Sequence, residues 1–327
     1  MNRDLLTILI CPSCGSELAL AGEEAVNGAI ESGLLRCRGC SRRYPITRGV
    51  PRFVAPENYA DSFGLQWNRF RRTQLDSHSG HPISRDRFFR CTGWRPEELR
   101  DARILDVGCG AGRFTEIALA AGAHVVAVDY SNAVDACHEN HAASPRLDVV
   151  QADVYALPLT PGSFDFAYCM GVLQHTPDVR RAFLALPPML RHGGRLAVDV
   201  YPKLRRNAIW PKYWLRPLTR RLPAARLFGL VERAVPVLLP LSLALGRIPG
   251  VGRQLRRAIP VANYEDVLPL TPRQVKEWAV LDTFDMLAPA YDQPQAAETL
   301  RAWFTEAGMN DVWVGRMGFL VGRGTRP

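Results

Sequence analysis

The stretch "ILDVGCGAGRF", residues 104–114, has glycine at three alternate positions directly after an apolar run. An apolar strand that leads through a glycine turn into a helix is the usual setting of a nucleotide-binding loop. The spacing differs from the dinucleotide motif, whose last glycine would stand at Arg113 rather than at Gly112. The turn also lacks the Gly-Lys-Ser/Thr ending of a P-loop. We therefore expect it to hold a nucleotide of another kind.

Three carboxylates narrow the choice of ligand. Asp106 stands two residues before the first glycine, while Asp129 and Asp153 end the next two predicted strands. A carboxylate at the first position repels a pyrophosphate and attracts an ammonium or sulfonium group. The second lies where an acid accepts the ribose hydroxyls, and the third is placed to accept an adenine amino group. A ligand with an adenosine end and a cationic end, such as S-adenosylmethionine, satisfies all three.

Apolar strands and helices alternate along residues 101–202 and again along residues 291–327. Strands such as "RILDVG" and "HVVAVD" are mainly apolar without alternation, which is typical of parallel strands that are buried on both faces. Helices such as the one predicted at "GRFTEIALAAG" supply the cover for such a sheet. The pattern predicts an α/β fold with helices on both faces of a parallel sheet, interrupted by residues 203–290.

The segments "ILDVGCGAGRF", "VVAVDYS", "VVQADVYALPLTPGSFDFAYCMGVLQHTPD" and "LRHGGRLAVDVY" resemble the class I S-adenosylmethionine-dependent methyltransferases. The resemblance implies that the glycine turn lies against the methionyl part of the cofactor and that later residues hold the ribose and adenine. The cofactor-binding residues implied in this way are Asp106, Gly108, Gly110, Gly112, Asp129, Tyr130, Asp153, Val154 and, near the reacting end, Met170.

The candidate catalytic residue is His175, which follows the fourth predicted strand and is of the type that most often acts as a base at neutral pH. Many family members also have histidine at the position of Gln174, so this chain departs from them there. The alternative is that His175 is a loop residue bonded to backbone. Further candidates for the acceptor side, which also fit a packing role, are Asp199, Tyr201, Trp278, Asp282, Asp285, Tyr291 and the aromatic stretch "FGLQWNRF".

Four of the eight cysteines form two C-x-x-C pairs, Cys11/Cys14 and Cys37/Cys40. Two such pairs have the ligand number of a zinc ribbon, in which four thiolates make a closed structural site. The cysteines together with "YPITRGVP" resemble the small zinc-ribbon domains that act as partners of tRNA and translation-factor methyltransferases. The resemblance implies a structural zinc and an activator or docking role in cis; four reduced cysteines without metal are the alternative.

The net charge of +9 is concentrated in one segment. Residues 203–257 contain thirteen Lys or Arg and one acid, Glu232. The apolar stretch 234–246 contains two prolines and is shorter than the roughly 18 residues of a membrane-spanning helix. We expect residues 203–260 to make peripheral membrane contact. The alternatives are RNA binding and a helical lid or oligomer contact with a solvated basic face.

The predicted organisation has four parts: a zinc-ribbon domain (1–56), an N-terminal helical linker or lid (57–100), a Rossmann-like methyltransferase core (101–202 and 291–327) and a basic, apolar, proline-rich insertion (203–290). The predicted function is S-adenosylmethionine-dependent methylation of an oxygen, as O- or carboxyl-methylation, on a small-molecule or lipid-linked acceptor. The alternatives are an RNA methyltransferase and a non-catalytic cofactor-binding partner. The apolar N-terminus lacks the features of a signal peptide, so we expect a cytoplasmic protein, peripheral at the inner face of the membrane.

Overall fold

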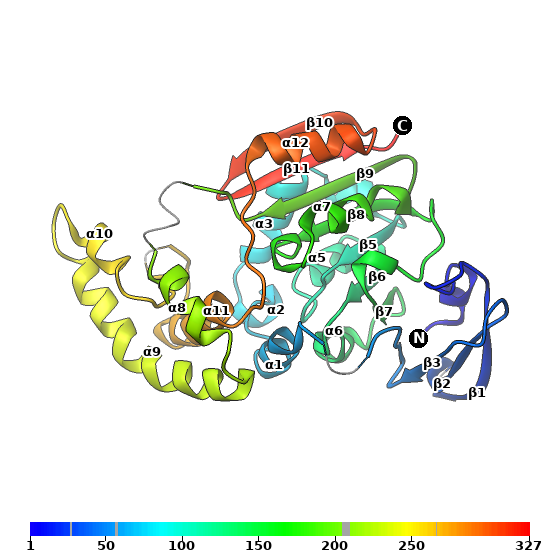
Figure 1. The fold of residues 1–327 in the computed structure, drawn as a ribbon, viewed down its shortest axis with the longest axis horizontal. Coiled ribbons are helices and arrows are strands. Elements are labelled where there is room, and N and C mark those ends of the chain that lie inside the picture. Colours follow the sequence, from blue (N-terminus) through cyan, green and yellow to red (C-terminus); the bar gives the residue numbers. More distant parts are fainter. Residues whose placement is uncertain (27, 56–57, 205–209, 266) are drawn as a thin grey trace.

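The computed structural model describes residues 1–327 except positions 27, 56–57, 205–209 and 266 (Figure 1). The boundary predicted at residues 56–57, and Arg205 and Arg206 of the basic segment, lie outside the described residues. The N-terminal part is an antiparallel sheet whose strands lie side by side in chain order. They are β1 (Leu18–Val26), β2 (Ala29–Cys37), β3 (Arg43–Thr47) and β4 (Val50–Pro51), preceded by the 3-10 helix η1 (Arg3–Thr7).

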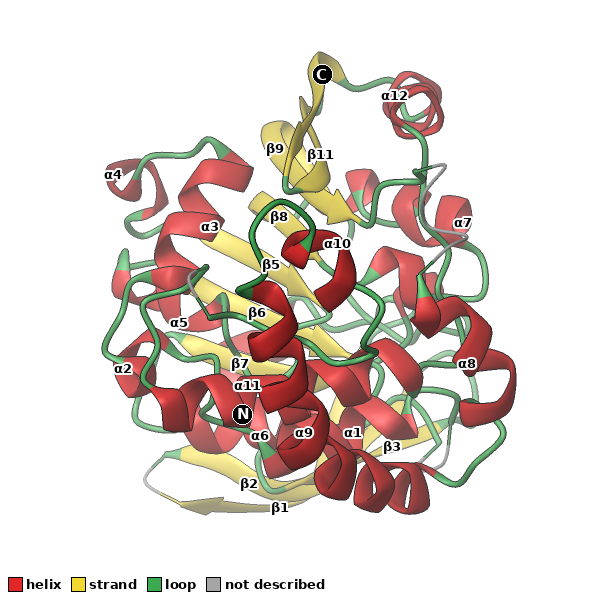
Figure 2. Ribbon diagram, turned by 90° about the vertical axis from the view of Figure 1, so that its left-hand side faces the viewer, coloured by secondary structure: helices red, strands yellow, loops and turns green. Residues whose placement is uncertain are grey.

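The central sheet has the strand order β10-β11-β9-β8-β5-β6-β7 (Figure 2). Its strands β5 to β9 are mutually parallel, as predicted, whereas β11 runs antiparallel to both β9 and β10. Only Gly318 separates β10 from β11, and its φ of 87° lets the chain reverse there. The prediction of an α/β sheet is confirmed, with an antiparallel edge added. The strands are β5 (Arg103–Val107), β6 (His124–Asp129), β7 (Leu147–Gln151), β8 (Phe164–Met170), β9 (Leu190–Val200), β10 (Asn310–Met317) and β11 (Phe319–Thr325).

Helices cover both faces of this sheet because successive side chains of a strand point to opposite faces. Along β5, Leu105 and Val107 belong to one hydrophobic cluster and Ile104 to the other. The first cluster includes α7 (Val179–Leu184) and α12 (Ala297–Glu306); the second includes α3 (Ile83–Thr92), α4 (Pro96–Leu99), α5 (Thr115–Ala120) and α6 (Ala133–His141). The helix predicted to follow β8 is short, because two prolines after α7 begin the 3-10 helix η4 (Pro187–Met189).

Hydrophobic packing joins the N-terminal sheet to the β7 edge of the central sheet. Ile30 and Leu35 of β2 are fully buried in the same cluster as Leu159, which lies beyond β7. Arg52 also forms a parallel bridge with Gln151 at the end of β7. The N-terminal sheet is therefore part of a continuous core with the central sheet and lies at one end of the molecule (Figure 1).

The described part of residues 203–290 lies at the opposite end of the molecule (Figure 1). Val231 and Val235 of one helix pack with Ala279 and Phe284 of another in a third hydrophobic cluster. The helices of this insertion are α8 (Pro211–Thr219), α9 (Ala224–Gly246), α10 (Gly252–Arg256) and α11 (Pro272–Leu287); α1 (Asp61–Arg69) and α2 (Asp76–Ser79) precede the core.

Helix α9 differs from the expectation at its two prolines. The sequence predicts an interruption at Pro236 and Pro240, but the helix continues through both for 23 residues. The packing of one apolar face on α11 offsets the backbone hydrogen bonds that the prolines remove. The expectation that this segment is too short to span a membrane is therefore wrong by length and composition alone, since α9 contains an 18-residue window with a mean hydropathy of 1.6. About 33% of that window is buried in the protein.

Candidate active site

The glycine turn lies where the strand order of the central sheet reverses. β5 pairs with β6 on one side and with β8 on the other, and the chain proceeds outward from this pair in both directions. Such a reversal leaves a crevice at the carboxyl ends of the strands, which is the usual ligand site of open α/β sheets. The loops that follow β5, β6 and β8 meet at this crevice.

Two glycines of the turn are required by the close approach of other segments. Gly108 and Gly110 have φ values of 81° and 53°. A Cβ atom on Gly108 would lie 2.3 Å from Cγ2 of Val172, and one on Gly110 would lie 3.2 Å from Nε1 of Trp67. A larger residue would push the loop after β8, or helix α1, away from the turn.

A cavity of about 100 Å³ lies against this turn. Three aromatic rings from α1 and the loop before it, Tyr59, Phe63 and Trp67, line it as well. The volume is smaller than the roughly 300 Å³ or more of usual ligand pockets. The predicted residues on the cavity wall are Gly108, Gly110, Asp129, Tyr130, Val154 and His175.

Asp129 ties the end of β6 to the glycine turn. Its Oδ2 accepts a hydrogen bond from the Gly110 amide at 2.9 Å, and its Oδ1 accepts two from the Ser131 amide and hydroxyl at 2.8 and 2.7 Å. Burial raises the pKa of this carboxyl, and the three donors oppose that shift. The carboxylate is thus fixed on the cavity wall, where ribose hydroxyls can donate to it.

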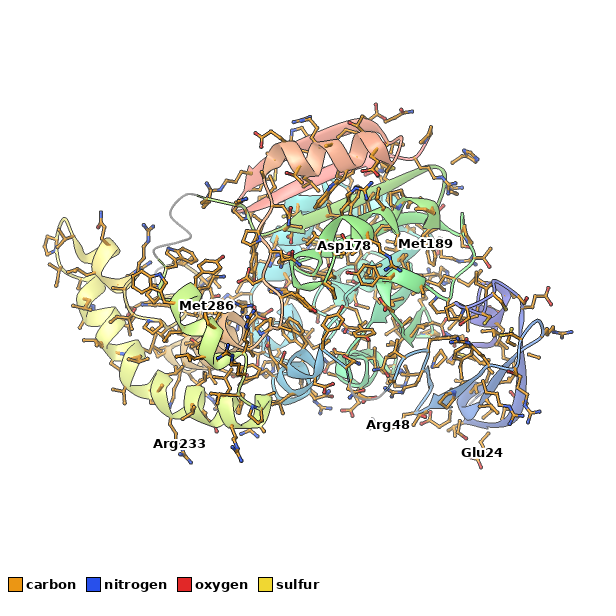
Figure 3. The ribbon with its side chains drawn as sticks, viewed as in Figure 1. Glu24, Arg48, Asp178, Met189, Arg233 and Met286 are labelled. Atoms are coloured by element: carbon orange, nitrogen blue, oxygen red, sulfur yellow. The ribbon has the colours of Figure 1, made fainter. Side chains whose placement is uncertain are left out.

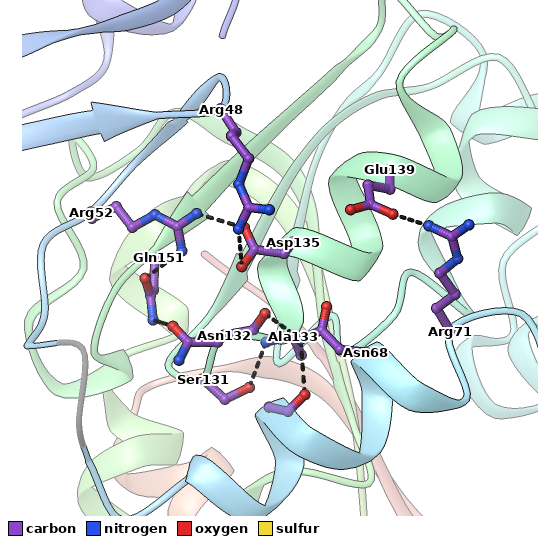
Figure 4. A network of polar contacts seen from close by, with 11 residues as sticks. Arg48, Arg52, Asn68, Arg71, Ser131, Asn132, Ala133, Asp135, Glu139 and Gln151 are labelled. Carbon is purple, nitrogen blue, oxygen red and sulfur yellow. Dashed lines mark hydrogen bonds and ion pairs between the residues drawn. The ribbon is translucent and has the colours of Figure 1, made fainter.

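The segment after β6 is held from both sides (Figure 4). Nε2 of Gln151 donates to the Tyr130 carbonyl at 3.2 Å, and Nδ2 of Asn68 in α1 donates to the Asn132 carbonyl at 2.9 Å. Arg52 in turn donates to Gln151 Oε1 at 2.8 Å. A chain of hydrogen bonds therefore links the N-terminal domain, through β7, to the residues beside Asp129.

Asp106 lies behind the turn and not on the cavity wall. Its buried Oδ2 accepts hydrogen bonds from the Thr115 hydroxyl at 2.6 Å and the Tyr168 hydroxyl at 2.7 Å. Desolvation raises its pKa to about 7, against the opposing effect of those two donors. The side chain joins β5 to α5 and β8, so the structure does not bring it to the cavity with the other predicted residues.

Three more predicted cofactor residues lie off this wall. A Cβ on Gly112 would be 2.5 Å from His141 Nε2, so Gly112 packs against α6. Asp153 accepts a hydrogen bond from the Tyr155 amide at 2.9 Å and caps the 3-10 helix η2 (Val154–Ala156). Met170 lines a neighbouring cavity.

His175, in the 3-10 helix η3 (Leu173–His175), presents one ring nitrogen without a partner. Its Nδ1 lies 2.9 Å from the carbonyl oxygen of Tyr291, and since a carbonyl only accepts, Nδ1 carries the proton. Its Nε2 is buried and has no hydrogen-bond partner among the residues described. Phe63 and Tyr201 pack against the ring, with centroids 5.2 and 5.4 Å away. The geometry leaves Nε2 as a proton acceptor at the cavity.

A second cavity, of about 550 Å³, adjoins the first; Trp67 and Gly171 line both. It is formed by α3, the glycine turn, the ends of β9 and β11, and the insertion. The structure brings together here the acceptor-side candidates Tyr201, Trp278, Asp282 and Asp285. Asp199 does not line this cavity. It forms an ion pair at 2.8 Å with Arg87, which does line the cavity.

Asp282 is the carboxyl of this second cavity with the most unusual surroundings. It accepts hydrogen bonds from the Tyr264 hydroxyl and, at 3.3 Å, from Nε2 of Gln74. Burial raises its pKa to about 7, with a further contribution from the negative charge of Asp285. A carboxyl in this range can take up or release a proton near neutral pH.

Arg113 and Arg87 also line the second cavity, and neither is among the residues predicted from the sequence. Arg113 donates to Ser84 and Gln74 at 2.8 Å each, and burial lowers its pKa to about 10. The signal for Arg113 was its place in the glycine stretch, where a dinucleotide motif has glycine. Arg87 had no such signal, because α3 is separated from the turn along the chain.

The four paired cysteines converge at the tip of the N-terminal sheet. The sulfur atoms of Cys11, Cys14, Cys37 and Cys40 all lie within 4.8 Å of one another. Four thiolates around zinc at 2.3 Å would be spaced by about 3.8 Å. The amides of Gly39 and Cys40 both donate to the Cys37 sulfur at 3.3 Å, as suits a thiolate. The donor set and its spacing fit a structural zinc ion.

Two family models match parts of the chain. The model described as "Methyltransferase domain" matches residues 105–198, and the model described as "Trm112p-like protein" matches residues 2–49. The chain therefore contains a methyltransferase domain with a Trm112p-like domain N-terminal to it. Both predicted resemblances are confirmed.

Individual relatives share only part of their length with this chain. An uncharacterised protein of Synechococcus sp. is 29% identical over 238 residues, which are 67% of this chain and 49% of that protein. The ubiquinone biosynthesis O-methyltransferase of Xylella fastidiosa is 37% identical over 104 residues, 31% of this chain and 42% of that protein. The chain thus spans about half the length of the curated relatives it matches. Among solved structures, a complex of the Haloferax volcanii Trm112 methyltransferase activator with a methyltransferase is similar to this chain, at 11% identity and a TM-score of 0.48. The match covers 82% of this chain and 98% of the matched chain.

Proposed function

We propose that this chain, a methyltransferase domain joined to a Trm112p-like domain, transfers a methyl group from S-adenosylmethionine to an oxygen of a small-molecule or lipid-linked acceptor. The observation that carries the proposal is the pair of adjoining cavities, one against the glycine turn and a larger one beyond Trp67 and Gly171. A group-transfer enzyme needs a donor site and an acceptor site in contact.

The residues of the first cavity suit the cofactor. Asp129 offers a carboxylate to the ribose, and Tyr130 and Val154 offer surfaces to the adenine. The rings of Phe63 and Trp67 line the same cavity and suit a sulfonium, which is attracted to aromatic faces. When bound, the cofactor supplies an electrophilic methyl group, and the aromatic rings of α1 that line the cavity help to exclude water.

The acceptor oxygen loses its proton to the chain. His175 is the group for this role, since Nδ1 is fixed by the Tyr291 carbonyl and Nε2 is unpartnered at the cavity. Oxygen as the accepting atom is supported by the named activity of the Xylella fastidiosa relative, a ubiquinone biosynthesis O-methyltransferase. RNA methylation is the second candidate, favoured by the Trm112p-like domain and the basic insertion.

The cysteine cluster holds a structural zinc ion in this proposal. Its four thiolates leave no open coordination position, so the metal stabilises the N-terminal domain and takes no part in methyl transfer. The domain contacts the core beside β7, where it supports the segment that carries Asp129.

Calorimetry with S-adenosylmethionine tests the cofactor site. We expect the wild type to bind and Asp129→Ala to bind at least about tenfold more weakly, because ribose contacts are lost. Asp153→Ala tests the predicted adenine contact separately. Absence of binding to the wild type would overturn the cofactor assignment.

Transfer of label from S-adenosylmethionine with a tritiated methyl group tests the acceptor class. We expect label in a total lipid extract or a small-molecule fraction, and lability to mild alkali would distinguish a carboxyl ester from an ether. Label that appears in RNA and not in these fractions would establish the second candidate.

Kinetics of His175→Ala test the base. We expect kcat to fall by roughly 10²- to 10⁴-fold while the affinity for cofactor changes little, because only proton removal is lost. His124→Ala, an exposed histidine at the start of β6, is the matched control and is expected to keep full activity. Equal kcat in wild type and His175→Ala would remove His175 from the mechanism.

A further inference from the structure

Helix α8 is folded with its polar side inward. Lys212 and Arg216 are buried, whereas Trp214 and Leu218 are 67% and 66% exposed. A surface helix of a soluble protein normally has the reverse arrangement. This orientation of α8 therefore requires contacts that hold the polar side chains inward.

The cause is a set of buried polar contacts with the segment after α11. Lys212 Nζ forms an ion pair with Asp292 Oδ2 at 2.9 Å. The Arg216 guanidinium donates to the carbonyl oxygens of Met286 at 3.1 Å and Pro289 at 2.8 Å. Rotation of α8 to hide Leu218 would break these contacts and leave buried charges unpaired, so the apolar side chains are held outward.

Helix α9 also exposes apolar side chains, over a greater length, although its inner face is apolar. Leu230 and Val237 are 53% and 70% exposed, and Leu241 continues the same stripe at helical spacing. The opposite face is buried on α11 through Val231 and Val235. The helix is therefore apolar on both its inner and outer faces along its second half.

This exposure is confined to one region. Of the twelve large apolar side chains exposed in the described part of the chain, ten belong to residues 203–290. The ten are Trp214, Leu218, Leu222, Leu230, Val237, Leu241, Ile248, Val251, Leu255 and Val267. Exposed apolar surface that gathers in this way marks an interaction site and not scattered surface residues.

The charge around these side chains indicates the partner. Exposed arginines at both ends of the α8–α9 connection and along α9 include Arg220, Arg221, Arg226 and Arg233. Figure 3 shows Arg233 on the outer side of α9. An apolar stripe with arginines beside it matches the boundary of an anionic lipid bilayer, where aliphatic chains enter the acyl region and guanidinium groups meet phosphates.

We propose that the outward apolar stripes of α8 and α9, with their flanking arginines, bind this protein peripherally to an anionic lipid bilayer. RNA fits less well, because the exposed side chains are mostly Leu, Val and Ile, which do not stack on bases. The buried inner face of α9 packs on α11, so the helix lies in the interface rather than across the membrane. This inference does not depend on the proposed methyl transfer.

Flotation of the full chain with vesicles tests the proposal. One set of vesicles is phosphatidylcholine alone, and the other contains roughly 30 mol% phosphatidylglycerol. We expect the wild type to float with the anionic vesicles at least about tenfold more than with the neutral ones, and less in high salt. A wild type that stays at the bottom with both sets would overturn the proposal.

The paired variant Leu230→Glu/Val237→Glu locates the surface. Both side chains are exposed, so thermal unfolding is expected to match the wild type while flotation falls at least about tenfold. The matched control is Val26→Glu, an exposed apolar position in the N-terminal sheet, which is expected to float normally.

Three results would contradict the assignment. Flotation of Leu230→Glu/Val237→Glu at the wild-type level would remove α9 from the contact. A wild-type dimer that this variant makes monomeric, without any flotation, would show that the stripe covers a second copy of the chain. A salt-dependent gel shift with RNA, without flotation, would identify RNA as the partner.

Discussion

The two ends of the molecule are attached to the same core in opposite ways (Figure 1). The Trm112p-like domain places its apolar side chains in the cluster that also fills one face of the central sheet. The insertion has a hydrophobic cluster of its own, and its described residues leave ten large apolar side chains exposed. The N-terminal domain thus depends on the shared core and on a cysteine cluster. The insertion packs on the core and still exposes an apolar surface.

This difference shows that buried apolar side chains stabilise the fold, whereas exposed ones are available for interaction. A domain as small as residues 2–49 buries too little surface to fold securely, so most of its large apolar side chains pack into the shared core and a metal site adds further stability. In the insertion, polar residues take the inner positions of α8, and apolar residues remain outside. Four substitutions would test this comparison.

Cys37→Ser has the largest expected effect. Structural zinc sites contribute about 10 kcal/mol or more to folding, so loss of one thiolate should unfold the N-terminal domain. We expect elemental analysis to find one zinc per wild-type chain and less than about a tenth of that in the variant. Thermal unfolding should show a new low-temperature transition.

The control for the zinc experiment is Cys91→Ala, a buried cysteine outside the cluster, which should keep its metal. Wild-type protein without zinc, but with an intact N-terminal domain, would show that hydrophobic packing alone suffices at this end of the molecule.

Lys212→Met tests the buried ion pair that holds α8 in the insertion. Removal of Lys212 leaves Asp292 with only the Arg216 guanidinium, 3.9 Å away, as a charged partner, and the free energy of unfolding should fall by about 3 kcal/mol. Chemical denaturation measures it. Lys276→Met, an exposed lysine of α11, is the matched control and should change it by less than about 0.5 kcal/mol. Equal stabilities would mean that α8 is not held outward by this pair.

Asp106→Asn tests the core that both ends share. Its pKa is raised from 3.8 to about 7 in the folded protein, so the folded state favours the protonated carboxyl. The stabilisation by that form is complete below the unfolded pKa and is lost as the pH rises through about 7. Asparagine still accepts the two hydroxyl hydrogen bonds but does not titrate.

The stability of Asp106→Asn relative to wild type should therefore rise by about 3 kcal/mol between about pH 5 and about pH 8. Denaturant unfolding at the two pH values measures this difference. A constant difference would show that Asp106 is already ionised in the folded protein.

The sequence predicted the parts of this molecule whose signals are local. The glycine turn, the end of β6 at Asp129 and the cysteine pairs all depend on spacing within a few residues, whereas β7 ends at Gln151, two residues before the predicted end at Asp153. The second cavity depends on contacts between α3, the glycine turn and α11, so no local sequence pattern predicts that Arg87 lines it. The inward orientation of α8 depends on Asp292, which lies far along the sequence, and the continuity of α9 depends on packing that local proline rules do not include.

Arg52→Ala has the smallest expected effect and asks whether the N-terminal end supports the cofactor site. Arg52 donates to Gln151 at 2.8 Å and to Asp135 at 2.6 Å (Figure 4). Gln151 in turn holds the Tyr130 carbonyl beside the cavity. Loss of these charged hydrogen bonds should reduce stability by roughly 1–3 kcal/mol and weaken S-adenosylmethionine binding several-fold in calorimetry.

The matched control for Arg52 is Arg48→Ala, because Arg48 pairs with the same Asp135 at 2.8 Å but is largely exposed and does not contact Gln151 in the described structure. An exposed pair contributes about 0–1 kcal/mol, so Arg48→Ala should leave cofactor affinity unchanged. If both variants weaken cofactor binding equally, the effect comes from the charge on Asp135. If only Arg52→Ala weakens cofactor binding, the effect is transmitted through Gln151, and the N-terminal domain supports catalysis by positioning the segment after β6.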